Sequence, residues 1–322
     1  MVGCEISGGL GNQFFRYAIA RAILEESKNK SCEEQLLINA RHVDTHGVSG
    51  NLFDFHIYDY ARGDVRRLEL SYGSVFQKLL FGVYWLLQKT LGRFVSLYKQ
   101  KIDLRLRQFM TKYGIVVSEN ADTEPLMLPS PSWKGNIFTY GSFEKYDYFK
   151  GIANILKCEF TPIHPSCKEN ENLYEVIRNT NSICLAVRRG DFMTGNNKKT
   201  FYVCDIEYFK RAVDYMQKRV ENPVFIVFSN DIAWVKENIK IEGKVLYESG
   251  NDPVWETFRL MYSCKHFVIS NSTLHWWAQW RSENENKIVV APDHWYNAEG
   301  WENHLMLDSF VRIPTGVPYK KQ

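Results

Sequence analysis

The sequence lacks several patterns that assign chains of this size to familiar functional classes. No two cysteines are spaced as CxxC, which argues against a zinc site. The formal net charge is only +3, and the lysines and arginines are scattered among nearly as many acids, which argues against nucleic acid as a partner. No D-x-D motif occurs, although many nucleotide-sugar enzymes hold a divalent ion through it. We therefore expect a chemistry that requires no metal ion and no cofactor.

Long apolar runs are also missing. The first residues, "MVGCEISGGLGN", show no basic segment followed by an apolar one, which is the pattern of a secretory signal. The most apolar stretch is "LLFGVYWLL", Leu79–Leu87, which is far too short to span a bilayer. It predicts an amphipathic helix packed on its own domain, and the alternative is contact with a membrane surface or a partner. The seven cysteines are widely spaced and odd in number, which suits a reducing compartment. Together these features predict a cytoplasmic protein, with or without peripheral contact with the cytoplasmic membrane.

The sequence does contain a clear alternation of strands and helices. At the N-terminus, the strand "VGCEI" leads through the glycine turn "SGGLGN" to the helix "QFFRYAIARAILEE". From about Ser182, short apolar strands end in polar loops and alternate with helices, a pattern typical of a parallel sheet covered on both faces. We predict an α/β protein with an N-terminal lobe over 1–160 and a C-terminal lobe over 161–322 that is built on a parallel sheet.

Polar residues stand where the predicted C-terminal strands end. In open parallel sheets, ligands bind beyond the carboxyl ends of the strands, so these residues are the candidates for a site. They are Arg188, Arg189, Asp191, Ser229, Asn230, Asp231, Asn271, Ser272 and Thr273.

Two of these candidates are adjacent arginines, Arg188 and Arg189, which directly follow the apolar run "ICLAV". Guanidinium groups that are fixed in place suit phosphate oxygens, which they can bind through two hydrogen bonds. The alternative is that one arginine bridges to a nearby acid while the other is solvated. In the absence of a D-x-D motif, the pair could replace a metal ion against a pyrophosphate.

The N-terminal glycine turn matches a dinucleotide-binding fingerprint only in part. Gly9 and Gly11 fit G-x-G, but Phe14 stands where the third glycine belongs, and the strand "QLLIN" ends in Asn39 where an acid is expected. An NAD-linked oxidoreductase is therefore the weaker interpretation. A glycine turn before a helix still presents backbone N–H groups to an anion or a sugar hydroxyl, and a simple tight turn is the alternative.

Four segments, in this order and spacing, are similar to the motif series of bacterial α-1,2-fucosyltransferases. They are "SGGLGNQFFRYAIARAI", "VRRGDF", "FSND" and "SNSTLHWWAQW", and the resemblance extends from Ser7 to about Asp308. It implies a GT-B-like fold of two Rossmann-like lobes, with GDP-fucose bound mainly by the C-terminal lobe. It also implies transfer of fucose from GDP-β-L-fucose, with inversion, to the 2-hydroxyl of a β-galactoside during surface glycan synthesis.

The resemblance also implies roles for individual residues. Arg188 and Arg189 resemble the arginines that hold the GDP pyrophosphate, Asp231 resembles an acid that reads guanine, and the loop Ser270–Thr273 resembles donor-phosphate contacts. The residues that resemble the N-terminal motif facing the cleft are Gly9, Gly11, Asn12 and Gln13.

Two positions depart from the family pattern. Ala186 stands where many relatives have histidine, and Asn230 stands where relatives often have a first acid. Both departures bear on how guanine is recognised.

The expected base for the acceptor proton is Asp191, with Glu144 and His275 as alternatives. Two alternatives to the whole function stay open, a GDP-fucose transferase of another linkage and a module that binds nucleotide or glycan without turnover.

Overall fold

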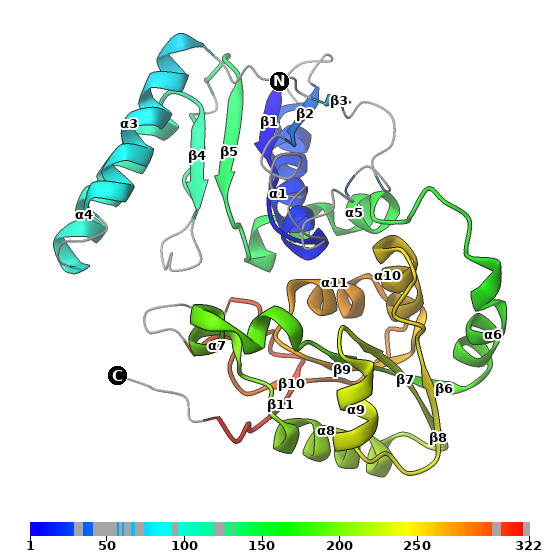
Figure 1. Ribbon diagram of the computed structural model, residues 1–322. Coiled ribbons are helices and arrows are strands. Elements are labelled where there is room, and N and C mark those ends of the chain that lie inside the picture. Colours follow the sequence, from blue (N-terminus) through cyan, green and yellow to red (C-terminus); the bar gives the residue numbers. More distant parts are fainter. Residues whose placement is uncertain are drawn as a thin grey trace. The chain divides into compact units, whose positions relative to one another are not determined.

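A computed structural model describes most of the chain. The described residues are 1–28, 35–40, 57, 60, 66–67, 74–91, 96–118, 126–130, 132–297 and 304–317. The chain divides into two compact units (Figure 1). The N-terminal unit comprises Met1–Ile57 and Ala61–Leu156, and the C-terminal unit comprises Tyr58–Tyr60 and Lys157–Gln322.

The N-terminal unit is built on a five-stranded sheet of order β3-β2-β1-β5-β4, in which all neighbours are parallel. Its strands are β1 (Val2–Glu5), β2 (Leu36–Asn39), β3 (Arg66–Arg67), β4 (Ile115–Ser118) and β5 (Ile137–Gly141). Its helices are α1 (Leu10–Lys28), α3 (Val75–Leu91) and α4 (Ser96–Thr111), and α5 (Ala153–Glu159) crosses into the C-terminal unit. The predicted strand, turn and helix at the N-terminus are confirmed as β1, a glycine turn and α1.

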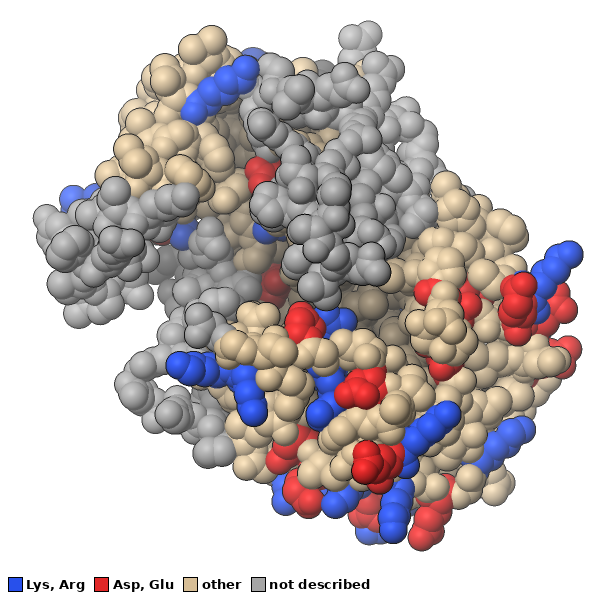
Figure 2. Space-filling model, in the orientation of Figure 1, with Lys and Arg blue, Asp and Glu red and all other residues tan. Residues whose placement is uncertain are grey.

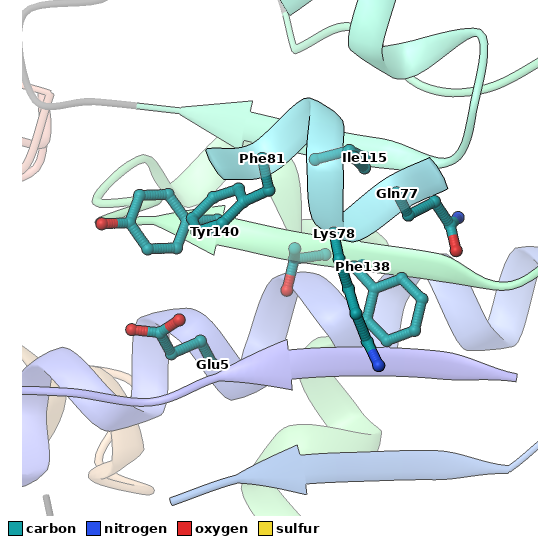
Figure 3. Close-up of a pocket in the computed structure, with 8 residues that line it drawn as sticks. Glu5, Gln77, Lys78, Phe81, Ile115, Phe138 and Tyr140 are labelled. Atoms are coloured by element: carbon teal, nitrogen blue, oxygen red, sulfur yellow. The ribbon is translucent and has the colours of Figure 1, made fainter. Parts of the chain in front are cut away.

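Helix α3 contains the apolar stretch "LLFGVYWLL" and packs against its own unit, as predicted. Its inner face carries Tyr84, which is buried with Met110 of α4 and with Ile115 and Val117 of β4. A small cavity of about 130 Å³ remains between α3 and the sheet, where Phe81 lies beside Tyr140 and Glu5 of β1 is among the lining residues (Figure 3). Within the described chain, no helix is both long and apolar enough to cross a membrane.

The C-terminal unit is built on a six-stranded sheet of order β11-β10-β9-β6-β7-β8, which is again entirely parallel. Its strands are β6 (Asn181–Val187), β7 (Pro223–Ser229), β8 (Lys244–Tyr247), β9 (His266–Ile269), β10 (Val289–Pro292) and β11 (Val311–Ile313). Its helices are α6 (Glu171–Asn179), α7 (Gly195–Phe201), α8 (Ile206–Arg219), α9 (Ile232–Asn238), α10 (Val254–Ser263) and α11 (Thr273–Arg281).

Helices cover both faces of the C-terminal sheet, with α8 and α9 on one side and α10 and α11 on the other (Figure 1). Because successive side chains of a strand point to opposite faces, a strand covered on both sides must be apolar throughout. Strand β6 fits this rule over its last five residues, since Ile183 to Val187 are all apolar and buried. The predicted α/β class with a parallel C-terminal sheet is confirmed, and the N-terminal sheet proves to be parallel as well.

Candidate functional site

The polar ends of the C-terminal strands meet at one edge of the sheet. Strands β9, β6, β7 and β8 are consecutive neighbours and run in the same direction, so the loops that follow them lie side by side. The register places Val187 of β6 opposite Ser229 of β7, and Ala186 opposite Ile269 of β9. The candidate residues Arg188, Arg189 and Asp191 therefore lie between the loop that contains Asp231 and the loop that contains Ser272.

Arg188 is held at both its backbone and its side chain. Its N–H donates to Ser270 Oγ at 2.9 Å, and the Ser270 hydroxyl donates to the Ala186 carbonyl at 2.8 Å, which ties the end of β6 to the end of β9. Its Nη2 lies 2.7 Å from Asp191 Oδ1, and its guanidinium lies 5.6 Å from the ring centre of Phe192. The side chain stays 33% exposed, so the guanidinium can still reach a ligand.

Arg189 is held by the loop that follows β7. Its N–H donates to Asn230 Oδ1 at 2.9 Å, and its Nε lies 3.3 Å from Asp231 Oδ2. Its guanidinium stacks on Trp234 at 3.6 Å from the ring centre, a cation–π contact that fixes the plane of the group. Each arginine therefore bridges to a carboxylate, where the alternative expected one bridged and one solvated arginine, and phosphate binding by the pair stays a prediction.

Gly190 makes this arrangement possible. Its φ is +39°, and a Cβ on this residue would stand 2.2 Å from Nδ2 of Asn230. Asn230, one of the two departures from the family pattern, therefore fills the space above Gly190 and accepts the bond from Arg189. The other departure, Ala186, is completely buried in β6, so its side chain does not reach the edge of the sheet.

The two arginines and the two aspartates of this cluster have no net charge together, but the guanidinium groups keep N–H donors that are not used in the ion pairs. Each arginine engages its carboxylate through one nitrogen, Nη2 in Arg188 and Nε in Arg189. A guanidinium carries five N–H donors, so several remain available on each group. The cluster can therefore offer a pair of oriented cations to an anion without first breaking an ion pair.

Asp231 also begins a helix. Its Oδ1 accepts the N–H of Trp234 at 3.2 Å, which makes it the N-cap of α9, while its own N–H donates to Ser229 Oγ at 3.0 Å. The side chain is 40% exposed. Capping is thus one role of Asp231, and contact with a ligand stays a prediction.

The loop after β9 combines one buried amide with two more accessible residues. Asn271 is buried, and its Nδ2 donates to the carbonyls of Phe201 and Trp295 at 2.9 and 2.8 Å, so its side chain joins the β9 loop to the end of α7 and to the loop after β10. Ser272 and Thr273 are half-buried at the beginning of α11. The N–H groups of a first helical turn, together with these hydroxyls, suit an anion.

His275 lies in the first turn of α11, close to Arg188. Burial and the positive charge of Arg188 lower the pKa of His275 to about 3, and its Nδ1 has no hydrogen-bond partner. The imidazole is therefore neutral at physiological pH and is a weak proton acceptor. This counts against His275 as the catalytic base.

Sequence reasoning missed Glu248 at the same edge. It directly follows β8, is only 5% exposed, and leaves Oε1 without a hydrogen-bond partner. Burial and the neighbouring Asp252 carboxyl raise the pKa of Glu248 to about 7. The rule that selects residues at strand ends applies to it as well, because "KVLY" immediately precedes it.

The N-terminal candidates lie at the carboxyl end of β1, in the other unit. The Gly9 carbonyl accepts the N–H groups of Asn12 and Gln13 at 3.0 and 3.1 Å, and so begins α1. Gln13 is completely buried, with Nε2 donating to the Gly8 carbonyl and Oε1 accepting the Ile57 N–H. The Gln13 side chain thus shapes the turn, whereas Gly9 and Asn12 are half-buried. Gly11 is buried in the first turn of the helix.

The described residues contain no group of three or more histidines, cysteines and acids that could hold a metal ion. Two lobes, each a parallel sheet with covering helices, place the chain in the GT-B class of glycosyltransferase folds. In a solved structure of the NodZ α-1,6-fucosyltransferase co-crystallised with GDP, the same fold recurs with a TM-score of 0.50 and 12% identity, over 86% of this chain and 91% of that one.

Residues 1–308 match glycosyl transferase family 11, and the chain belongs to this family. Over 330 residues it is 25% identical to the O-antigen biosynthesis glycosyltransferase WbnK of Escherichia coli, covering 97% of this chain and 100% of that protein. An alpha-1,2-colitosyltransferase of Escherichia coli is 32% identical over 173 residues, 52% of this chain and 59% of that protein. Human galactoside alpha-(1,2)-fucosyltransferase 1 is 34% identical over 96 residues, 29% and 26% of the two chains. The resemblance predicted from the four motifs is thereby confirmed.

The raised pKa of Glu248 predicts a pH-dependent stability. An unfolded glutamate ionises near pH 4.5 and the folded one near 7, so the folded state holds an extra proton between these values. The contribution of Glu248 to stability is therefore complete below about pH 4.5 and falls as pH rises through 7. The side chain of Glu248→Gln stays neutral throughout. As pH rises from 5 to 8, the urea midpoint of this variant should therefore increase relative to that of the wild type.

The matched control is Glu242→Gln, at an exposed glutamate. The difference between its urea midpoint and that of the wild type should stay constant between pH 5 and 8. A constant difference between Glu248→Gln and the wild type across this range would contradict the raised pKa.

Proposed function

We propose that this glycosyltransferase moves fucose from GDP-β-L-fucose to the 2-hydroxyl of a β-galactoside, giving an α-1,2 linkage in a surface glycan. The C-terminal unit would bind the donor and the N-terminal unit the acceptor. The observation that carries the proposal is the pair of ion-paired arginines, Arg188 and Arg189, at the carboxyl edge of the C-terminal sheet. Family membership supports the reaction type, and the names of its α-1,2-specific relatives support the linkage.

The donor pyrophosphate would lie against Arg188 and Arg189, with the first turn of α11 supplying further N–H donors. The guanine base would extend toward the β7 loop, where the Asp231 carboxylate can accept its N–H groups. Glu248 stands one strand farther along the same edge, so the base or ribose is the part of the nucleotide that it would meet.

In the transfer step, the acceptor oxygen forms a bond to the anomeric carbon from the face opposite the leaving group. The bond from that carbon to the phosphate oxygen breaks, and its electron pair passes to the β-phosphate of GDP. The negative charge that grows there is what the two arginines would stabilise in place of a metal ion. A nucleoside diphosphate leaves readily, so no general acid is needed.

The proton of the acceptor hydroxyl would pass to a base or to water. Asp191 is already paired with Arg188 at 2.7 Å, so its first role is to orient that guanidinium. It keeps the proposed role of base if substrate binding frees one of its oxygens. Glu144 is half-buried in the N-terminal unit and remains the second candidate.

A second candidate donor follows from the alpha-1,2-colitosyltransferase among the relatives. Colitose differs from fucose in lacking one hydroxyl, so the same pyrophosphate and guanine contacts would serve GDP-colitose. Discrimination would then depend on the sugar pocket.

The first test is GDP release from GDP-fucose and from GDP-colitose against a panel of β-galactosides, with linkage analysis of the product. We expect GDP-fucose to give an α-1,2 product, and the rate should persist in excess EDTA. Donor binding without acceptor-dependent GDP release would indicate a binding module. A product with another linkage would contradict the proposed acceptor position, and restoration by Mg²⁺ of activity lost in EDTA would contradict the metal-free mechanism.

Asp231 can be tested without losing its helix cap. Asparagine is as good an N-cap as aspartate, so Asp231→Asn should keep α9 while removing the carboxylate. If the carboxylate reads guanine, the affinity for GDP should fall by roughly 1–3 kcal/mol, as measured by calorimetry. Asp231→Ala should weaken binding and also lower the unfolding midpoint. Wild-type affinity in the asparagine variant would limit Asp231 to capping and to its pairing with Arg189.

The arginine pair is tested with Arg188→Lys and Arg189→Lys. Lysine keeps the charge but not the planar group, and the loss of one preorganised donor typically costs on the order of 10²–10³ in kcat. Arg188 should show the larger loss, because it directly follows β6. Since the charge appears only in the transition state, kcat should fall more than donor affinity.

The control is Arg219→Lys, an exposed arginine that stacks on Tyr215 at the far end of α8 and should retain full activity. If both lysine variants at 188 and 189 keep more than about half of wild-type activity, the arginines are not the phosphate clamp. An increase in KM alone would mean that they bind the donor uniformly.

A further inference from the structure

Helix α3 presents a row of large apolar side chains to solvent. Val75, Leu79 and Val83 are spaced by four residues and are 73%, 63% and 51% exposed, and Phe76 is 47% exposed. Such spacing places side chains on one face of a helix. Leu86, seven residues after Leu79, extends the row by another turn at 58% exposed, and the neighbouring Trp85 is 47% exposed outside the row. Most of the large apolar side chains that are exposed in the described structure thus belong to this one helix.

The exposed row continues onto α4. The rings of Phe76 and Phe109 both contact the ring of Tyr113, at 4.8 and 5.1 Å between ring centres. Phe109 is itself 42% exposed, and it lies on the same face of α4 as the exposed Arg105 and Lys112. The two helices therefore share one outer surface, here called the hairpin face, which combines apolar rows with basic residues.

Packing within the N-terminal unit does not require this surface. The inner face of α3 already covers the sheet with Tyr84, Leu80 and Phe81, as Figure 3 shows for Phe81. In Figure 2 the described surface over α3 is almost entirely tan, whereas red and blue alternate over α8 and α9. A contiguous apolar surface of this kind marks a site of interaction.

The charge of the same segment is strongly one-sided. Residues 75–112 contain eight lysines and arginines and a single acid, Asp103, for a net charge of +7. The whole chain carries +3, so the remaining residues together carry −4. Asp103 is in addition paired with Arg107. Residues 75–112 are therefore a strongly basic segment of a chain whose other residues together are slightly acidic.

We propose that the hairpin face docks the N-terminal unit on an anionic lipid surface. The apolar row would enter the boundary between headgroups and acyl chains, while Arg105 and Lys112 meet the phosphates. A second copy of the chain suits the face less well, because a two-fold interface would oppose two equally basic surfaces. The proposal does not depend on the donor or the linkage of the transfer reaction.

The test is co-sedimentation of the full chain with vesicles of phosphatidylcholine alone or with about 30% phosphatidylglycerol. We expect binding to the anionic vesicles that weakens when salt is raised from about 0.1 M to 0.5 M, because salt screens the attraction. Leu79→Glu/Val83→Glu and Arg105→Glu/Lys112→Glu should each reduce the partition coefficient at least about tenfold. All four side chains are exposed, so circular dichroism should report unchanged folding.

The matched control is Ile163→Glu, at an apolar residue of the C-terminal unit that is 47% exposed, and this variant should bind vesicles like the wild type. GDP release with a water-soluble acceptor should be unchanged in every variant, so a failure of docking can be distinguished from a failure of the proposed reaction. Equal binding to neutral and anionic vesicles, or full binding by the glutamate variants, would overturn the proposal. So would a dimer in sedimentation velocity that Leu79→Glu/Val83→Glu dissociates, since the face would then join two copies.

Discussion

Two positive charges at consecutive positions repel each other, and the C-terminal unit is arranged to hold them. Arg188 and Arg189 each have their own carboxylate and their own backbone anchor, and the anchors come from different strands. Ser270 secures the first arginine from β9, and Asn230 secures the second from β7. Without these ties, repulsion would turn the guanidinium groups apart and toward solvent. The arrangement of the arginine pair therefore depends on three loops rather than on the arginines alone.

This dependence explains why small residues matter beside the arginines. Gly190 adopts a positive φ and leaves room for Asn230, which then accepts the N–H of Arg189. Asn271, which could bind a ligand directly, instead joins the β9 loop to the end of α7 and to the loop after β10 through its amide. Each contact reduces the freedom of the loops before any ligand arrives, and such preorganisation lets fixed charges act on a transition state.

The N-terminal unit uses a similar parallel sheet for different purposes. Its glycine turn is shaped by Gln13, which is buried and bridges the turn to Ile57. Its outer helices carry the surplus of basic and apolar surface, whereas the arginine cluster of the other unit is neutral as a whole. The charge proposed to attract a lipid surface and the charge proposed to stabilise a leaving group are thus located in separate units.

The sequence alone determined the strands of the C-terminal unit from β6 to β10, the helices that alternate with them, and the edge at which polar residues gather. Those features follow from apolar periodicity and from the common direction of parallel strands, which are local or topological properties. The pairing of Arg188 with Asp191 is also local, since one turn of chain separates them. Only the tertiary structure decided that Arg189 meets Asp231, and that Ser270 ties the first arginine, because these partners lie 42 and 82 residues away.

Burial was likewise decided by tertiary packing. Asn271 and Glu248 both follow strands, yet their side chains differ in their contacts. The Asn271 amide donates to two backbone carbonyls, whereas Glu248 has one oxygen without a hydrogen-bond partner and a carboxyl group with a raised pKa. The stretch "LLFGVYWLL" predicted a helix, but which of its apolar residues face the sheet depended on how α3 lies against β4 and β5. A sequence specifies which side chains are available, whereas their pKa values and exposure depend on neighbours that only the folded chain brings together.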